Sequence, residues 1–139
     1  MNELVTDKIQ SIQLCIARAR EEYNADPEHF ETNYTRQDAA ILNVIRACEQ
    51  AIDLANHVIK GRKMGVPTSS TESFELLQKH AVIEPKLADQ LKKMVYFRNL
   101  VIHRYQQMEL DIVKAVIVSG LDDLIAFGDR ILAFTQKSS

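Results

Sequence analysis

Apolar residues recur three or four positions apart along most of this chain, which is the spacing that places them on one face of an α-helix. The spacing persists long enough to predict a helix in five segments. These segments run from about Asn2 to Tyr23, from Gln37 to Lys60, from Ser70 to Lys79, from Pro85 to the polar break that begins at Tyr105, and from Leu110 to Phe134. Only short polar connections separate them, and the chain has no internal repeat.

Residues that favour helix ends stand beside these segments. Thr35 and Asp38 have the spacing of a capping box, and Ser69 and Glu72 have it as well, so each pair is expected to close the start of its helix. Pro85 suits the first position of a helix, where its missing amide hydrogen costs nothing. The second helix is expected to end at the residues that follow it, Gly61, Gly65 and Pro67.

Five helices with short connections predict an all-α fold, an antiparallel helical bundle. The length of 139 residues suits one domain, which we expect to span residues 1–139. The composition agrees with this expectation, because 46% of the residues are hydrophobic and the chain has only 4 glycines and 3 prolines. An ordered helical chain is therefore predicted, and disorder is not.

Charge and cysteine content narrow the possible functions. The formal net charge is −2, so any binding of nucleic acid requires a local basic patch. Cys15 and Cys48 lack the spacing of metal ligands and are expected to be buried, reduced thiols, and no metal site is predicted. The N-terminus has no secretion signal and no apolar run approaches membrane-spanning length, so we expect a cytoplasmic protein without membrane contact.

The stretch MVYFRNLVIHRYQQ, residues 94–107, combines the apolar character of a core helix with an unusual density of polar groups. Its polar members are Arg98, Asn99, His103, Arg104 and Tyr105. A core helix usually avoids such groups, because a buried charge has to find a partner or give up its charge. The cluster therefore forms either a structural network or a functional site.

The helical repeat of about 100° per residue places these side chains relative to one another. Arg98, Ile102 and Tyr105 share one narrow face, while Asn99 and His103 form a neighbouring pair four residues apart. Arg98 and His103 point in directions that differ by roughly 140°. They can converge only if the helix tightens or ends near His103, or if two copies of the chain come together.

Each member of the cluster also has a purely structural interpretation. Arg98 could form a partly buried ion pair with Asp53 or Glu49 of the second helix. His103 could stabilise the C-terminal end of its helix, where a cationic imidazole suits the helix dipole. Tyr105 could be a surface aromatic residue without a role. For any single residue this interpretation is favoured, but it accounts less well for the combination.

An arginine and a histidine together also suit RNA cleavage without a metal. Arginine keeps its charge and binds phosphate through a planar fork, while histidine exchanges protons near neutral pH. One group could activate a ribose 2′-hydroxyl, and the other could stabilise negative charge on the scissile phosphate. Residues that could guide RNA towards the pair are Lys60, Arg62, Lys63, Lys92 and Lys93, although charged surface runs are usually only solvated.

The order Arg98, four residues, His103, one residue, Tyr105 resembles the signature of HepT toxins in the HEPN superfamily. Four segments resemble the second helix, the loop with the short third helix, the signature helix and the final helix of this family: ILNVIRACEQAIDLANHVI, GVPTSSTESFELL, KKMVYFRNLVIHRY and LDIVKAVIVSGLDDL. The resemblance covers nearly the whole chain apart from about the first thirty residues and the tail.

The resemblance implies a HEPN-like bundle that forms a homodimer and acts as an RNase toxin in a type VII toxin–antitoxin system. Arg98 and His103 match the catalytic positions, with RNA as the substrate and no cofactor. Asn99 matches a polar residue that is common after the arginine. Arg104 is basic where relatives carry acidic or other residues, which could alter phosphate binding.

The resemblance also implies a protein partner, a minimal nucleotidyltransferase (MntA-like) antitoxin. Its expected action is AMPylation of Tyr105, which would place negative charge and bulk in an RNA groove shared by two signature helices. The alternative is a non-catalytic module that holds a nucleotide or the nucleotidyltransferase. A purely structural helical dimer is a third possibility, which the complete motif disfavours.

Overall fold

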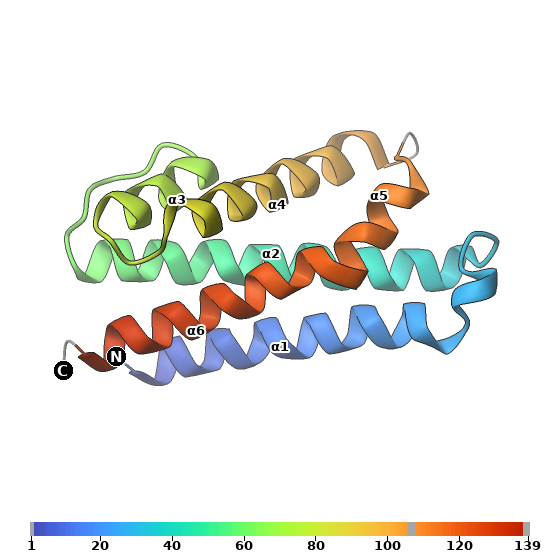
Figure 1. Ribbon diagram of the computed structural model, residues 1–139, viewed down its shortest axis with the longest axis horizontal. Helices are drawn as coiled ribbons and strands as arrows, with labels where there is room; N and C mark the ends of the chain where they lie inside the picture. The colour runs from blue at the N-terminus through green and yellow to red at the C-terminus, as the bar shows by residue number, and fades with distance from the viewer. Residues whose placement is uncertain (1, 106–107, 138–139) are drawn as a thin grey trace.

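The computed structural model describes residues 2–105 and 108–137, and these ranges contain helices and no strand. The helices are α1 (Asn2–Ala25), α2 (Tyr34–Gly61), α3 (Ser70–Lys79), α4 (Pro85–Arg104), α5 (Leu110–Ala115) and α6 (Leu121–Lys137), as Figure 1 shows. A short 3₁₀ turn, Pro27–His29, follows α1, and a π-helical turn, Val116–Gly120, joins α5 to α6. The predicted all-α bundle is confirmed. Residues 106 and 107 of the expected polar break lie outside the described ranges.

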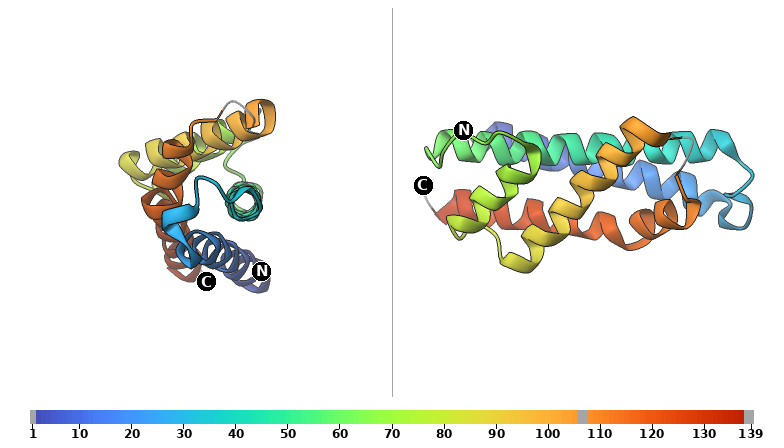
Figure 2. Two further views of the ribbon diagram at one scale, coloured as in Figure 1. Left: turned by 90° about the vertical axis from the view of Figure 1, so that its right-hand side faces the viewer. Right: turned by 90° about the horizontal axis from the view of Figure 1, so that it is seen from above.

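The two long helices α1 and α2 lie side by side and run in opposite directions, and α6 lies along both of them (Figure 1). Helices α3 and α4 form a second layer over α2, and α4 crosses the long helices obliquely in the view from above (Figure 2). The C-terminal end of α4 therefore lies at the same end of the bundle as the start of α2. This arrangement brings residues 94–105 close to a helix that begins sixty residues earlier.

One continuous hydrophobic core connects all the long helices. Phe74 of α3 and Phe127 of α6 are fully buried and meet edge to face, with ring centroids 5.4 Å apart. Phe30, which follows the 3₁₀ turn, is also fully buried and contacts Tyr23 with a centroid separation of 5.1 Å. Burial of each such ring contributes about 2 kcal/mol, so these contacts fix how the connecting segments and α3 dock onto α1 and α6.

The predicted ends of the helices are partly confirmed. Ser69 caps α3 as expected, because its hydroxyl oxygen accepts a hydrogen bond from the amide of Glu72 at 3.1 Å. The capping box at Thr35 and Asp38 was wrong. The helix begins at Tyr34, and its cap is Asn33, whose side chain accepts from the amide of Arg36 at 3.1 Å. An asparagine two residues before Thr35 offers the same type of acceptor, and this leaves the carboxylate of Asp38 available for another contact.

The last predicted helix, from about Leu110 to Phe134, is interrupted by the π-helical turn. Such a turn inserts one extra residue and weakens the hydrogen bonds of the helix locally. Arg20 of α1 compensates by donating from Nε to the carbonyl oxygen of Ile117 at 3.0 Å, and its Nη2 atom pairs with Asp122 at 2.8 Å. Hydrophobic periodicity did not reveal the interruption, because the partner that supports it comes from a distant helix.

Neither cysteine forms a disulfide, and both thiols are free. Cys48 is buried beside the Arg98 side chain, and burial raises the pKa of its thiol to about 12. Cys15 is half-buried, and burial raises its pKa as well. Both groups therefore remain protonated near neutral pH and contribute to packing. Across residues 2–105 and 108–137, no helix is both long and apolar enough to cross a membrane.

Candidate active site

Arg98 of α4 lies between two neighbouring helices. Its Nη1 atom is 3.0 Å from Oε1 of Glu49 in α2, and its Nη2 atom donates to the hydroxyl of Ser70 in α3 at 3.0 Å. Of the two carboxylates considered from the sequence, Glu49 is thus the one that pairs with Arg98. Asp53 lies one turn further along α2 and pairs instead with Lys8 of α1, at 3.5 Å.

The guanidinium of Arg98 is held in place but not fully saturated with hydrogen bonds. Its side chain is 17% exposed, and its Nε atom is buried without an acceptor among the described residues. Oε1 of Glu49 is also buried and accepts no hydrogen bond from the described residues, so the pair is held by charge rather than by an aligned hydrogen bond. A partly buried cation of this kind keeps a fixed orientation, because moving it would leave Glu49 uncompensated.

The remaining motif residues of α4 lie on the outside of the bundle. Asn99, His103 and Arg104 are exposed, and His103 and Arg104 occupy the last turn of the helix, where cations suit the dipole. Helix α4 continues without interruption to Arg104, so it does not tighten in a way that would turn His103 towards Arg98. No hydrogen bond or ion pair between Arg98 and His103 exists in the described part of the chain.

Tyr105 directly follows α4 and reaches back to the start of α2. Its hydroxyl donates a hydrogen bond to Oδ1 of Asp38, across 67 residues of sequence, while its side chain remains 41% exposed. The pKa of Tyr105 is raised to about 12, first by burial of the hydroxyl and then by the hydrogen bond and the charge of Asp38. The phenol is therefore a protonated group that solvent can reach.

Sequence reasoning missed two residues of this region. Asp38 was assigned to a helix cap and contacts Tyr105 instead, and Ser70 was not singled out although it binds Arg98. No short motif marks either contact, because each joins residues of different helices. A pocket of about 380 Å³ has both Asp38 and Tyr105 in its wall.

The outward face of α4 carries an exposed apolar strip beside the motif. This face is formed by Tyr96 and by the residues three, four and seven positions after it, which are Asn99, Leu100 and His103. Tyr96 is 62% exposed and Leu100 is 38% exposed. The bundle covers only part of the apolar surface of this helix, because Leu100 and Ile102 stay exposed while four other apolar residues are buried within the chain: Met94, Val95, Phe97 and Val101.

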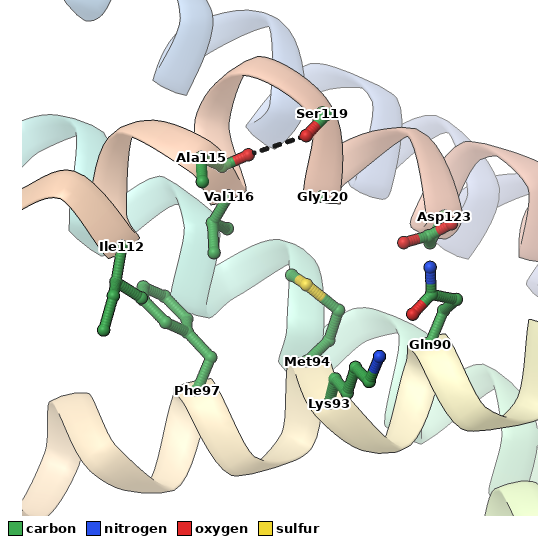
Figure 3. Close-up of a pocket in the computed structure, with 10 residues that line it drawn as sticks. All are labelled: Gln90, Lys93, Met94, Phe97, Ile112, Ala115, Val116, Ser119, Gly120 and Asp123. Carbon is green, nitrogen blue, oxygen red and sulfur yellow. Dashed lines mark hydrogen bonds between the residues drawn. The ribbon is translucent and has the colours of Figure 1, made fainter.

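A second concave surface lies on the other side of α4. This cavity of about 470 Å³ is bounded by α4, by α5, by the π-helical turn and by the start of α6 (Figure 3). Met94 and Phe97 point from α4 towards Val116 and Ile112, while Gln90 and Asp123 face each other at one end (Figure 3). Neither Arg98 nor His103 lines this cavity.

The basic residues proposed as RNA guides have different surroundings. Arg62 lies over the ring of Phe134 with 4.8 Å between its guanidinium carbon and the ring centroid, and Lys92 pairs with Asp89 at 3.6 Å. Lys60 and Lys63 are exposed, and Lys93 borders the cavity of Figure 3. In the described ranges, no three His, Cys, Asp or Glu side chains are grouped in a way that could hold a metal ion.

The helical bundle, with arginine, histidine and tyrosine in this order along its fourth helix, has the architecture of a HEPN toxin. Residues 12–131 match the family described as "Ribonuclease HepT-like". The chain belongs to this family.

Characterised relatives and solved structures resemble nearly the whole chain. The mRNA nuclease HepT of Shewanella oneidensis is 43% identical over 133 residues, which is 96% of this chain and 99% of the relative. The structure of a tri-AMPylated Shewanella oneidensis HEPN toxin in complex with MNT antitoxin has a TM-score of 0.90 at 43% identity, with 96% and 99% of the two chains covered. The structure of a toxin–antitoxin with AMP-PNP has a TM-score of 0.89 at 41% identity, with 94% and 98% covered.

Proposed function

We propose that Arg98 and His103 are the catalytic pair of this ribonuclease, which acts as the toxin of a toxin–antitoxin pair. The observation that carries the proposal is the combination of a fixed guanidinium and an exposed imidazole on one helix. The likeness to an mRNA nuclease over nearly the full length supports RNA as the substrate. Cellular RNA as a substrate implies a cytoplasmic protein.

The proposed reaction needs one proton acceptor and one stabiliser of charge. His103 takes the proton of a ribose 2′-hydroxyl while that oxygen attacks the adjacent phosphorus to form a cyclic phosphate. The bond to the 5′-oxygen of the next nucleotide breaks, and that oxygen takes up a proton from water. Arg98 stabilises the negative charge that grows on the phosphoryl oxygens, with its orientation set by Glu49 and Ser70. Asn99 and Arg104 are proposed to support binding of the phosphate, since both are exposed beside His103.

A second copy of the chain would complete this site. One chain presents Arg98 and His103 in directions that differ by roughly 140°, so a single scissile phosphate cannot easily contact both. His103 shares the outward face of α4 with the exposed side chains of Tyr96 and Leu100. Pairing of these faces in a homodimer would bury the apolar strip and set two copies of the motif along one shared groove.

We expect the purified protein to be a stable homodimer at micromolar concentration, measured by light scattering. Leu100→Lys should shift the population towards monomer, because it places a charge in the middle of the paired strip. Leu14→Lys is the matched control, since Leu14 is an exposed leucine of a different helix, α1. A parental protein that scatters as a monomer, or equal dimerisation of both variants, would contradict the shared groove.

We expect the purified protein to cleave single-stranded RNA in the presence of EDTA, because neither proposed role needs a metal. Arg98→Lys should reduce the cleavage rate by roughly 100-fold, since lysine retains the charge but not the planar fork that grips a phosphate. Arg46→Lys makes the same chemical change at an exposed position of α2 and should cleave at the parental rate.

The cleavage assay also distinguishes the proposed ribonuclease from the alternative, a non-catalytic module. A folded parental dimer that cleaves no RNA would favour the non-catalytic module that holds a nucleotide or the nucleotidyltransferase. Cleavage that stops in EDTA and returns with added metal would contradict the metal-independent mechanism. Full activity of Arg98→Lys would show that Arg98 contributes only positive electrostatic potential and that its planar fork is not needed.

The proposed regulation is AMPylation of Tyr105 by an MNT-type nucleotidyltransferase antitoxin. The exposed side chain of Tyr105 at the end of α4 supports this, as does the AMPylated state of the Shewanella oneidensis relative. Each AMP unit would bring a phosphodiester charge close to His103 and Arg104 in the chain. Arg104 would then hold the attached phosphate beside His103 in place of an RNA phosphate, which inhibits cleavage.

A further inference from the structure

The hydroxyl of Tyr105 has a single described hydrogen-bond partner, the carboxylate of Asp38. The two residues are separated by 67 positions in the sequence. Asp38 lies in the first turns of α2 and Tyr105 follows the last turn of α4, at the end of the bundle where these helices meet (Figure 1). Asp38 has no role in capping α2, because Asn33 performs that role. Its carboxylate therefore requires another explanation.

The contact is accessible to a second protein. Both side chains are exposed, and both line the pocket of about 380 Å³ that also includes Tyr34 and Gln37. A nucleotide or protein group that reaches the Tyr105 oxygen therefore also lies close to the carboxylate of Asp38. A buried structural hydrogen bond between helices would instead have been covered by neighbouring side chains.

We propose that Asp38 is the general base for nucleotidylation of Tyr105, so that the modified chain supplies the base for its own modification. The proposal rests on the proposed AMPylation of Tyr105. The Asp38 carboxylate already accepts a hydrogen bond from this hydroxyl in the resting chain, so it lies within reach of the proton that has to be removed. Protein kinases use an aspartate in the same way to accept the proton of a hydroxyl that attacks a phosphorus atom.

The step balances with a nucleoside triphosphate as the co-reactant. The Tyr105 oxygen forms a bond to the α-phosphorus of ATP, and the bond between that phosphorus and the bridging oxygen breaks to release pyrophosphate. The hydroxyl proton moves to Asp38 and then to water. The proton has to be removed as the new bond forms, because the pKa of Tyr105, at about 12, leaves very little phenolate at neutral pH.

Two other roles for Asp38 predict different results. If the contact only locked Tyr105 in place, its removal would free the acceptor and accelerate the modification. If the contact only stabilised the junction of α2 and α4, its removal would lower the unfolding temperature without changing the rate at which AMP is added. A general base is distinguished by a slower reaction in a folded variant, restored by another carboxylate.

The experiment measures the initial rate at which the protein gains its first AMP, by intact mass, with ATP and the cognate MNT nucleotidyltransferase. Asp38→Asn should lower this rate by roughly 100-fold, since an amide still accepts a hydrogen bond but does not take a proton. Asp38→Glu should recover most of the rate. Asp7→Asn changes an exposed carboxylate of α1 and is the matched control, while Tyr105→Phe tests the acceptor.

A second measurement needs no partner protein. The ¹³C chemical shift of the Tyr105 ring, followed by NMR through an alkaline titration, should report a lower pKa in Asp38→Asn than in the parental chain. The same pKa in both proteins would contradict the contact itself. An unchanged or faster AMP addition to Asp38→Asn would overturn the role as base and leave the proposed function intact. If Tyr105→Phe gains AMP like the parental chain, the acceptor assignment fails, and the proposal for Asp38 fails with it.

Discussion

Replacement of His103 by alanine is expected to reduce RNA cleavage about 100- to 10,000-fold and to abolish toxicity. The imidazole is the group of the motif that exchanges a proton near neutral pH, and general acid–base catalysis contributes about 100- to 10,000-fold to a rate. His103 is exposed at the end of α4 and lies outside the hydrophobic core. The variant should therefore retain the fold and the dimer, which circular dichroism and light scattering would verify.

A matched control separates this effect from a general effect of losing a histidine. His80 is also an exposed histidine at the C-terminal end of a helix, in this case α3, so His80→Ala removes a similar group with the same relation to a helix dipole. It should cleave RNA at the parental rate. Parental cleavage by the folded His103→Ala protein would falsify the assignment of His103 as the proton acceptor.

Replacement of Tyr105 by phenylalanine is expected to eliminate AMPylation and to leave the toxin active in cells that contain the antitoxin. The change removes only the hydroxyl, which is the proposed acceptor and also the donor to Asp38. The loss of one exposed hydrogen bond should cost no more than about 1 kcal/mol of stability. The variant should therefore fold, cleave RNA and keep its original mass after incubation with the nucleotidyltransferase and ATP.

Tyr96→Phe provides the comparison for this variant. Tyr96 lies on α4, which Tyr105 follows, and it is a phenol without a carboxylate partner among the described residues. It should acquire AMP at Tyr105 and be neutralised as the parental chain is. An AMP adduct on Tyr105→Phe would show that another residue is the acceptor, and peptide mapping would locate it.

The arrangement around Arg98 links the stability of the bundle to its proposed chemistry. Arg98 connects α4 to α2 through Glu49 and to α3 through Ser70, while its Nε atom keeps an unused donor. The same side chain thus restrains three helices and offers a charge with a fixed direction. Preorganisation of this kind reduces the reorganisation needed when a phosphate gains charge in the transition state.

The sequence by itself determined the helical architecture and the order of the motif. Helical periodicity and the cap at Ser69 depend on residues three or four positions apart, and such neighbours meet in any helix irrespective of the rest of the fold. The same local geometry placed Arg98 and His103 roughly 140° apart, and the uninterrupted course of α4 agrees with that separation.

Only the tertiary structure decided which distant groups meet. The choice of Glu49 over Asp53, the contact of Ser70 with Arg98 and the pairing of Tyr105 with Asp38 all depend on how far each helix is rotated and shifted against its neighbours. Those rotations follow from the packing of side chains such as Phe74 and Phe127 across the whole core. Glu49 and Asp53 lie one turn apart on α2, so the sequence pattern alone gives each the same chance of pairing with Arg98. The docking of the complete helices decides between them.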